Sequence, residues 1–181
     1  MSGTVFTIAQ QKGGAGKTTL AAQLAAAFAV KGQRVGTIDV DPQGSFSLWY
    51  AARMNALRDS DTIIHSQIQG WRIKKEADRL RAECDIVLID SHPHAATQAK
   101  MAIREADLVL IPMQPSPMDL WASSPTIKAA EIERKTVRLI LNRVDTRTKL
   151  TSAILNKMQE LDVQAASNTL GSRVAFAHSM M

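Results

Sequence analysis

The chain has 181 residues, 45% of them apolar, and this length and composition suit one domain with a single substantial core. Cys84 is the only cysteine, which excludes disulfides within the chain and Cys-x-x-Cys metal or cluster sites. The formal net charge of +5 suits a polyanionic partner, and it equally suits an enzyme with scattered surface lysines.

Strand-like and helix-like patterns alternate along the whole chain. Leu20, Leu24 and Phe28 recur every fourth residue, as on the buried face of a helix. In chain order we expect strand 5–9, helix 20–30, strand 34–40, helix 45–54, strand 62–64, helix 71–83, strand 85–90, helix 95–105, strand 107–112, helix 118–134, strand 136–142, helix 150–161 and a short strand 163–170. The alternation predicts an α/β fold, a mainly parallel twisted β-sheet with helices on both faces, in a single domain of residues 1–181.

The apolar stretches are too short for a membrane protein of the helical kind. The longest strongly apolar one, 20–30, contains Gln23 and falls far below the length that spans a bilayer. No basic region precedes the first apolar run, so the N-terminus does not read as a signal peptide. We therefore expect a cytoplasmic protein.

A glycine-rich loop follows the first predicted strand and leads directly into a helix. Residues 10–19 read Gln-Gln-Lys-Gly-Gly-Ala-Gly-Lys-Thr-Thr. The glycines let the backbone curl and turn its N–H groups toward one oxyanion, and the N-terminus of the helix adds its dipole. In such a loop Lys17 bridges the β- and γ-phosphates and the Thr18 hydroxyl holds Mg²⁺. The stretch predicts a nucleotide site that also holds Mg²⁺.

The loop departs from the ordinary P-loop because Gln11 stands where the first glycine is required, with a lysine beside it. Lys-Gly-Gly-x-Gly-Lys-Thr-Thr resembles the deviant Walker A loop of the ParA/MinD superfamily of P-loop ATPases. The resemblance implies that Lys12 reaches across a dimer to the nucleotide of the partner. The simpler alternative is a solvated lysine that raises the local potential. The implied nucleotide-binding residues are Lys12, Gly13, Gly14, Ala15, Gly16, Lys17, Thr18 and Thr19.

Three acidic residues close two of the predicted strands. Ligands of parallel sheets bind at the carboxyl ends of the strands, which is where these side chains lie. Asp90 ends an apolar strand as a Walker B carboxylate does and is expected to hold Mg²⁺ through water, beside the cation ligand Thr18. Asp39-x-Asp41-Pro-Gln resembles the first switch segment of the ParA branch, which implies that Asp41 positions the attacking water and Asp39 lies near Mg²⁺. The alternative for Asp41 is a helix cap and turn.

The resemblance also assigns residues to the base and to a second switch. It implies that Asn142 reads the adenine edge, although an asparagine at a strand end is more often a turn residue. It implies that Pro112, Met118 and Asp119 form the wall around the base. The second switch is expected at 90–93, where relatives usually carry proline in place of His92. A metal site formed by His92 and His94 is disfavoured because no third ligand is in view.

The resemblance extends over nearly the whole chain and is strongest to small ParA-type partition ATPases. It implies a weak Mg²⁺-dependent ATPase, with Lys12, Lys17 and Asp41 catalytic, that forms a homodimer on ATP. The dimer would bind DNA without sequence preference, associate with the nucleoid and drive plasmid or chromosome segregation, with a centromere-binding or adaptor protein that stimulates hydrolysis. The candidate DNA contacts are Arg143, Arg147, Lys149, Lys157 and Arg173. Their alternative is an ordinary solvated surface.

Other members of the superfamily suggest rival functions. Relatives usually continue beyond 175–177 into a final basic helix that this sequence is expected to lack. A MinD-type membrane or division-site regulator needs an amphipathic C-terminal helix, and 174–181 is too short and uncharged for one. Reductases of the nitrogenase-iron-protein type need paired cysteines. An ATP-dependent positioning scaffold for a protein cargo would share every nucleotide-binding residue and differ only in its partner.

Overall fold

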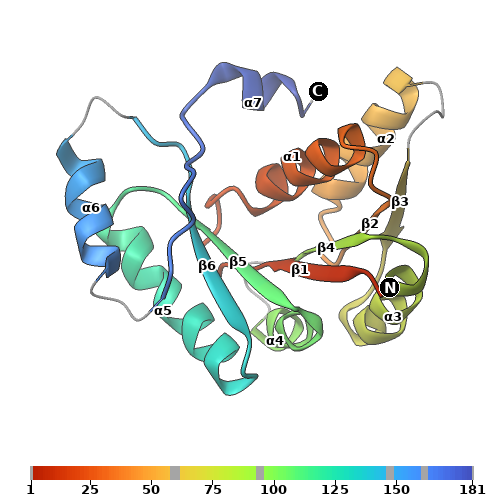
Figure 1. The fold of residues 1–181 in the computed structure, drawn as a ribbon, viewed down its shortest axis with the longest axis horizontal. Helices are drawn as coiled ribbons and strands as arrows, with labels where there is room; N and C mark the ends of the chain where they lie inside the picture. The colour runs from red at the N-terminus through yellow and green to blue at the C-terminus, as the bar shows by residue number, and fades with distance from the viewer. Residues whose placement is uncertain (1, 58–61, 93–95, 146–148, 160–162, 181) are drawn as a thin grey trace.

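The computed structural model describes residues 2–57, 62–92, 96–145, 149–159 and 163–180 (Figure 1). All of its paired strands run parallel, in the order β3-β2-β4-β1-β5-β6. The strands are β1 (Thr4–Ile8), β2 (Val35–Asp39), β3 (Ile63–Gln67), β4 (Ile86–Asp90), β5 (Leu108–Met113) and β6 (Thr136–Leu141). This confirms the predicted α/β fold with a parallel sheet.

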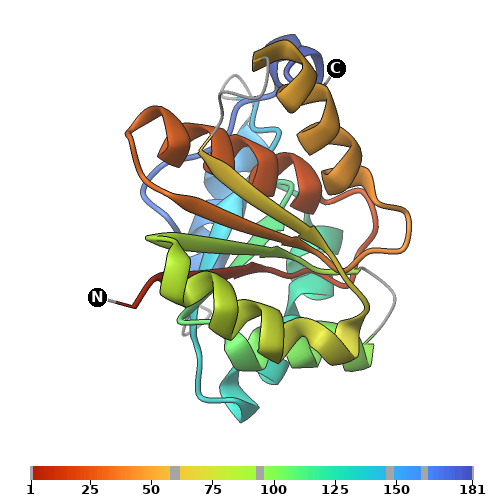
Figure 2. The ribbon, with the colours of Figure 1, turned by 90° about the vertical axis from the view of Figure 1, so that its right-hand side faces the viewer.

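Helices cover both faces of the sheet, as Figures 1 and 2 show. The helices are α1 (Lys17–Val30), α2 (Ser45–Leu57), α3 (Ile73–Glu83), α4 (Ala96–Glu105), α5 (Pro117–Ile132), α6 (Lys149–Gln159) and α7 (Val174–His178), with a 3₁₀ turn, η1 (Gly70–Arg72), before α3. Helices α1 and α2 pack on one face, and α3, α4 and α5 pack on the other. Because β1 lies between β4 and β5, the loop after β1 opens where the chain changes direction across the sheet.

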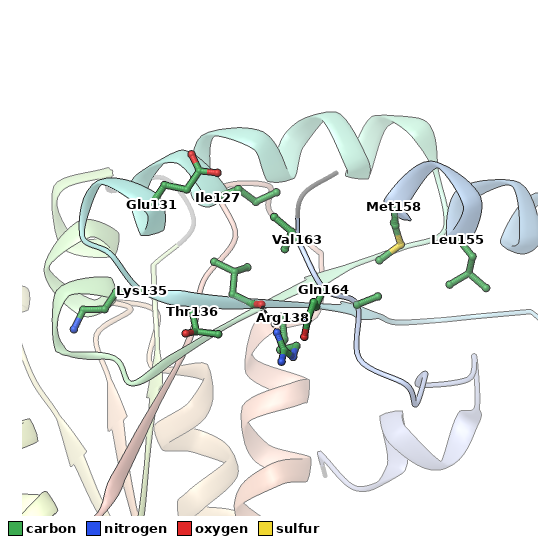
Figure 3. Close-up of a pocket in the computed structure, with 11 residues that line it drawn as sticks. Ile127, Glu131, Lys135, Thr136, Arg138, Leu155, Met158, Val163 and Gln164 are labelled. Carbon is green, nitrogen blue, oxygen red and sulfur yellow. Dashed lines mark hydrogen bonds between the residues drawn. The ribbon is translucent and has the colours of Figure 1, made fainter. Parts of the chain in front are cut away.

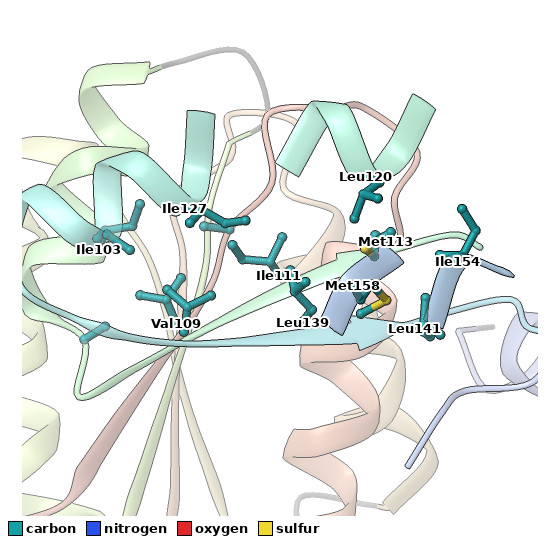
Figure 4. Close-up of a cluster of buried hydrophobic side chains, with 14 of the residues drawn as sticks. Ile103, Val109, Ile111, Met113, Leu120, Ile127, Leu139, Leu141, Ile154 and Met158 are labelled. Carbon is teal, nitrogen blue, oxygen red and sulfur yellow. The ribbon is translucent and has the colours of Figure 1, made fainter. Parts of the chain in front are cut away.

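The core consists of apolar layers on the two faces. Alternate residues of β5 and β6 meet α5 and α6 in a cluster that includes Ile111, Leu139 and Met158 (Figure 4). On the opposite face, β2 and β4 meet α1 and α2 around Phe46 and Leu88. Buried on both sides, the central strands are fixed in register, and so are the polar residues at their carboxyl ends.

Most predicted elements are confirmed, with shifts at their ends and one correction. The predicted strand 163–170 is wrong: this segment meets the sheet through a few backbone hydrogen bonds and the isolated bridges Leu139–Ala165 and Val144–Gly171, and it forms no regular strand. Its Ser-Asn-Thr sequence favours turns over a regular ladder. Helix α5 begins at the Ser116 cap and continues through Pro125, which is exposed.

Candidate active site

The loop between β1 and α1 has the backbone geometry that its glycines predict. Gly14 and Gly16 have φ values of 75° and 91°, in the left-handed region that favours glycine. A Cβ on Gly16 would also overlap the side-chain amide of Asn142. Helix α1 begins at Lys17, and its first turn carries neither an acidic residue nor a side-chain cap. The N–H groups at this end of α1 are thus left for an anion.

Lys17 is buried at the start of α1, with only 6% of its surface exposed. Burial lowers the pKa of Lys17, while the charges of Asp90 and Asp41 oppose that shift. The lysine therefore lies in the field of both predicted carboxylates. A buried cation next to open helix N–H groups is suited to bind the terminal phosphates of a nucleotide.

Asp90 and Thr18, the two residues predicted to bind Mg²⁺ together, are in direct contact. The Thr18 hydroxyl donates a hydrogen bond of 2.6 Å to Asp90 Oδ2. The other oxygen, Asp90 Oδ1, is buried without a hydrogen-bond donor among the described residues. Burial raises the pKa of Asp90 to about 7, against the hydrogen bond from Thr18 and with a contribution from the charge of Asp39.

An orphaned carboxylate oxygen beside a hydroxyl fits a divalent cation. Mg²⁺ takes few protein ligands, prefers oxygen, and completes its shell with phosphate oxygens and water. A bound cation would relieve the electrostatic penalty on Asp90 and satisfy Oδ1. The structure therefore brings together the Thr18 and Asp90 ligands that the sequence predicts, in a form that suits Mg²⁺.

Asp39 is equally buried but has its oxygens occupied by the chain itself. Its Oδ1 accepts the backbone N–H of Asp41 at 3.0 Å, and its Oδ2 accepts both the N–H and the hydroxyl of Ser47 at 2.9 Å. The carboxylate thereby ties the loop after β2 to the first turn of α2. A place for Asp39 near Mg²⁺ stays a prediction, and its direct contacts are structural.

Asp41 lies in a turn that starts at the end of β2. Its Oδ1 accepts the backbone N–H of Gln43 at 2.9 Å, and its carbonyl accepts the N–H of Gly44. The turn that was the alternative role for Asp41 is therefore present. Helix α2 itself begins only at Ser45. Asp41 also faces the second predicted switch, since His92 Nε2 lies 3.7 Å from Asp41 Oδ1. His94 lies outside the described residues.

Lys12 is held by its own chain. Its Nζ donates to Asp119 Oδ2 at 2.6 Å, and about 39% of the lysine side chain remains exposed. Burial acts to raise the pKa of Asp119, but the hydrogen bonds from Lys12, from Ser116 and from the backbone of Gln114 together lower it. Asp119 was predicted as part of the base wall; in the structure it forms this ion pair, and its contact with a base stays a prediction.

Asn142, at the end of β6, supports the P-loop. Its side-chain amide donates to the Ala15 carbonyl at 3.1 Å, and its Oδ1 accepts the N–H of Arg143 at 2.8 Å. A cavity of about 200 Å³ opens next to it. The lining residues are Thr19, Asn142, Arg143, Gly171, Ser172, Arg173, Phe176 and Met180. This cavity lies between α1, β6 and α7 and reaches Thr19, at the end of the glycine-rich loop.

The CobQ/CobB/MinD/ParA nucleotide-binding domain model matches residues 6–178. The chain belongs to this family. It is 30% identical to the maintenance of carboxysome distribution protein A of Halothiobacillus neapolitanus, over 99% of this chain and 86% of that protein. It is 31% identical to protein ParA of Rhizobium radiobacter, over 74% of this chain and 59% of the relative.

Solved structures of this ParA/MinD family share the fold. An ATP complex of Cyanothece McdA superposes with a TM-score of 0.82 at 17% identity, covering 99% of this chain and 87% of the other. A plasmid partition protein of Borrelia burgdorferi bound to AMPPNP gives a TM-score of 0.79 at 18% identity, covering 98% and 88%. The fold of this chain is therefore that of the ParA/MinD P-loop ATPases.

The family's base wall is not assembled around the cavity next to Asn142. Pro112 is buried within β5 and pairs with Ile140 of β6. Met118 is 63% exposed at the start of α5, beside the ion pair of Asp119. None of the three lines the cavity. Their contact with a base stays a prediction, and the residues that do line this cavity were not singled out as base contacts apart from Asn142.

The candidate DNA contacts do not form one visible patch. Arg143 and Arg173 are exposed, and both line the cavity beside the P-loop. Lys157 is exposed in the last turn of α6. Arg147 lies outside the described residues, as does the side chain of Lys149. DNA binding through these residues stays a prediction.

The largest described cavity lies away from the P-loop. It has a volume of about 740 Å³ and opens between α5, β6 and α6, with Ile127, Arg138 and Leu155 among its lining residues (Figure 3). No residue of the glycine-rich loop lines it. The candidate active site is therefore defined by its buried charged side chains and not by the size of a cavity.

No helix in the described parts of the chain has both the length and the apolar character needed to cross a membrane.

Proposed function

We propose that this chain is a Mg²⁺-dependent ATPase of the ParA type, switched by its bound nucleotide. The observation that supports this most is the buried, unpaired Asp90 Oδ1 next to the Thr18 hydroxyl and the buried Lys17. A bound Mg²⁺–triphosphate would provide a cation for the carboxylate and an anion for the lysine. The family membership and the ATP and AMPPNP complexes of structural relatives point the same way.

Each residue has a distinct task in this proposal. Lys17 and the N–H groups of α1 bind the β- and γ-phosphates, and Thr18 and Asp90 hold the cation. Bound Mg²⁺ supplies positive charge to the phosphate oxygens. Asp41 orients the attacking water from the loop after β2. Lys12, supplied by a second copy of the chain, neutralises charge that develops in the transition state.

Lys12 must leave Asp119 before it can serve a second copy. The pair is short at 2.6 Å, but the lysine side chain is about two fifths exposed, which keeps the pair weak. Contact with a triphosphate of the other subunit offers Lys12 more negative charge than one carboxylate does. ATP-dependent dimerisation therefore follows from an exchange of partners by one lysine.

The dimer is proposed to bind duplex DNA without sequence preference, to associate with the nucleoid, and to respond to an adaptor protein that stimulates hydrolysis. Two copies double the basic surface, so phosphate contacts that are too weak in one chain suffice in two. In this form the protein drives the segregation of a plasmid or chromosome, as the names of its ParA relatives suggest.

A protein cargo is the second candidate. It is favoured by the relative named for carboxysome distribution, which matches 99% of this chain. The nucleotide site and the DNA surface would be the same in both cases. Only the adaptor would differ: a centromere-bound protein in the first case and a cargo-bound protein in the second.

The proposal is tested by a mobility shift on random duplex DNA with ATP, with ADP and without nucleotide, over a series of salt concentrations. ATP-only binding that weakens steeply with salt is expected. Two variants accompany it: Asp41→Ala is expected to bind DNA with ATP but not to turn ATP over, and Lys12→Ala is expected to lose the ATP-dependent dimer in light scattering. Absence of any ATP-dependent DNA binding at low salt would remove the DNA-based function.

A further inference from the structure

A chain of side-chain hydrogen bonds runs behind the Asp41 loop, from β2 and β3 to α2. Thr37 and His65 are paired in register on neighbouring strands, and Thr37 Oγ1 lies 2.8 Å from His65 Nδ1. On the other side of the ring, His65 Nε2 lies 2.9 Å from Ser47 Oγ. Ser47 in turn donates its hydroxyl to Asp39 Oδ2. The chain ends on the carboxylate that holds the N–H of Asp41.

The imidazole of His65 is fixed in place by two rings of α2. It stacks on Tyr50 with ring centroids 4.8 Å apart and meets Phe46 edge-on at 5.7 Å. Between these rings the imidazole cannot turn without disturbing the packing of α2 on the sheet. Its two nitrogens are thereby aimed at Thr37 and at Ser47.

The number of hydrogens available couples the tautomer of His65 to the direction in which Ser47 donates. Ser47 has one hydroxyl hydrogen and two possible acceptors, Asp39 Oδ2 and His65 Nε2. If the hydrogen goes to Asp39, the Ser47 oxygen is left to accept, so Nε2 must carry the ring hydrogen. The opposite tautomer would attract the Ser47 hydrogen and withdraw it from Asp39.

We propose that His65 and Ser47 are positioning residues for the Asp41 loop: His65 directs the Ser47 hydroxyl onto Asp39, and Asp39 thereby holds Asp41 at the end of β2. A fully hydrogen-bonded Asp39 is rigid and keeps the Asp41 backbone and the first turn of α2 at a fixed separation. The role in hydrolysis rests on the proposed function, because Asp41 acts in catalysis only if the chain is an ATPase.

Two variants break the chain with little change in shape. Ser47→Ala removes the hydroxyl but keeps the backbone N–H on Asp39, and His65→Phe keeps a ring between Phe46 and Tyr50. Tyr50→Phe is the matched control, because it removes only a hydroxyl that donates to the Ile63 carbonyl on the same ring cluster. His65→Gln, whose amide can still donate toward Ser47, is the conservative variant.

The first readout is amide hydrogen exchange of Asp41 by NMR without nucleotide, with Val87 of the buried strand β4 as the internal reference. About tenfold faster exchange at Asp41 is expected in Ser47→Ala and His65→Phe. The second readout is steady-state ATP hydrolysis, in which kcat should fall about tenfold while KM changes less than about twofold. His65→Gln should restore part of both, and Tyr50→Phe should change neither.

The exchange measurement decides the proposal even if the chain hydrolyses no ATP, a result that would refute the proposed function alone. Unchanged exchange at Asp41 in both Ser47→Ala and His65→Phe would overturn the positioning role. An equal acceleration in Tyr50→Phe would overturn it too, because general loosening of α2 would then explain the effect.

Discussion

The carboxyl ends of β2 and β4 carry two buried aspartates that lie side by side and have opposite hydrogen-bonding status. Asp39 and Asp90 are paired in register, and neither exposes more than 1% of its surface. Asp39 accepts hydrogen bonds from Asp41 and Ser47 of its own chain. Asp90 accepts one from Thr18 and leaves its Oδ1 unpaired.

The difference separates a structural carboxylate from a ligand-binding one. A buried charge is stable only when donors or a cation surround it. The chain supplies those donors at β2, and the carboxylate in turn fixes the Asp41 loop. At β4 the described residues leave one oxygen of Asp90 without a donor, and we propose that a bound cation is the missing partner. Residue type and strand position are the same; the surrounding donors decide the function.

The largest effect is expected at Lys17, the buried lysine that lies in the field of Asp90 and Asp41. Lys17→Ala should lower ATP affinity at least about 100-fold, equivalent to about 3 kcal/mol, because the phosphates lose their buried cation. Isothermal titration calorimetry measures it, with Lys12→Ala as the control whose affinity in the monomer should change little. Unaltered ATP affinity in Lys17→Ala would refute the assignment of the phosphate site.

The next effect tests the structural role of Asp39. Asp39→Asn replaces an acceptor oxygen by an NH₂ group that faces hydrogen-bond donors. We expect a loss of about 2–3 kcal/mol in the free energy of unfolding, with no nucleotide present. Urea denaturation measures it. A loss below about 0.5 kcal/mol would mean that the hydrogen bonds of Asp39 contribute little.

The same change of aspartate to asparagine should increase the free energy of unfolding when it is made at Asp90. Burial raises the folded-state pKa of Asp90 to about 7 from 3.8, so between these values the folded state binds a proton that the unfolded state has lost. This contribution to stability is present at low pH and is lost as the pH rises through that range. Asp90→Asn avoids the loss and keeps an oxygen for Thr18.

We therefore expect Asp90→Asn without Mg²⁺ to be more stable than the wild type at pH 8 by on the order of 1–2 kcal/mol, with the advantage disappearing toward pH 4. Thermal unfolding over a pH series measures it. An Asp90→Asn protein that is less stable than the wild type at pH 8 would contradict the description of Asp90 as an uncompensated charge.

The smallest effect is expected at the partly exposed pair of Lys12 and Asp119. Asp119→Asn should change the free energy of unfolding by less than about 1 kcal/mol, because the retained side-chain oxygen can still accept the backbone N–H of Gln114 and the lost partner, Lys12, is partly exposed to solvent. Urea denaturation measures this change also. A larger loss would place Asp119 with Asp39, among the carboxylates on which the fold depends.

The features that the sequence predicts well are local ones. Glycine spacing gives the P-loop, apolar runs give the strands, and an aspartate at the end of such a run gives Asp90. The direct contact of Thr18 with Asp90 joins two such patterns 72 positions apart, and it forms because β1, which leads into the P-loop, pairs with β4.

Other contacts depend on how distant elements pack. Lys12 and Asp119 are 107 positions apart, and their pairing depends on where α5 meets the loop. The role of His65 is hidden for a related reason. It lies in the edge strand β3, whose polar side chains form hydrogen bonds with side chains of α2 and α3. In the sequence alone, these polar residues look like the loop that follows a short strand. Such side chains are recognised only when their partners are seen.

The central claim is that the open carboxylate of β4 belongs to a Mg²⁺–ATP site. The most direct measurement is calorimetric titration of the wild type and of Asp90→Asn with a slowly hydrolysed ATP analogue, with and without Mg²⁺. The account predicts that Mg²⁺ strengthens binding to the wild type at least about tenfold and has little effect on binding to Asp90→Asn. No binding to the wild type, or an equal Mg²⁺ effect in both proteins, would contradict it.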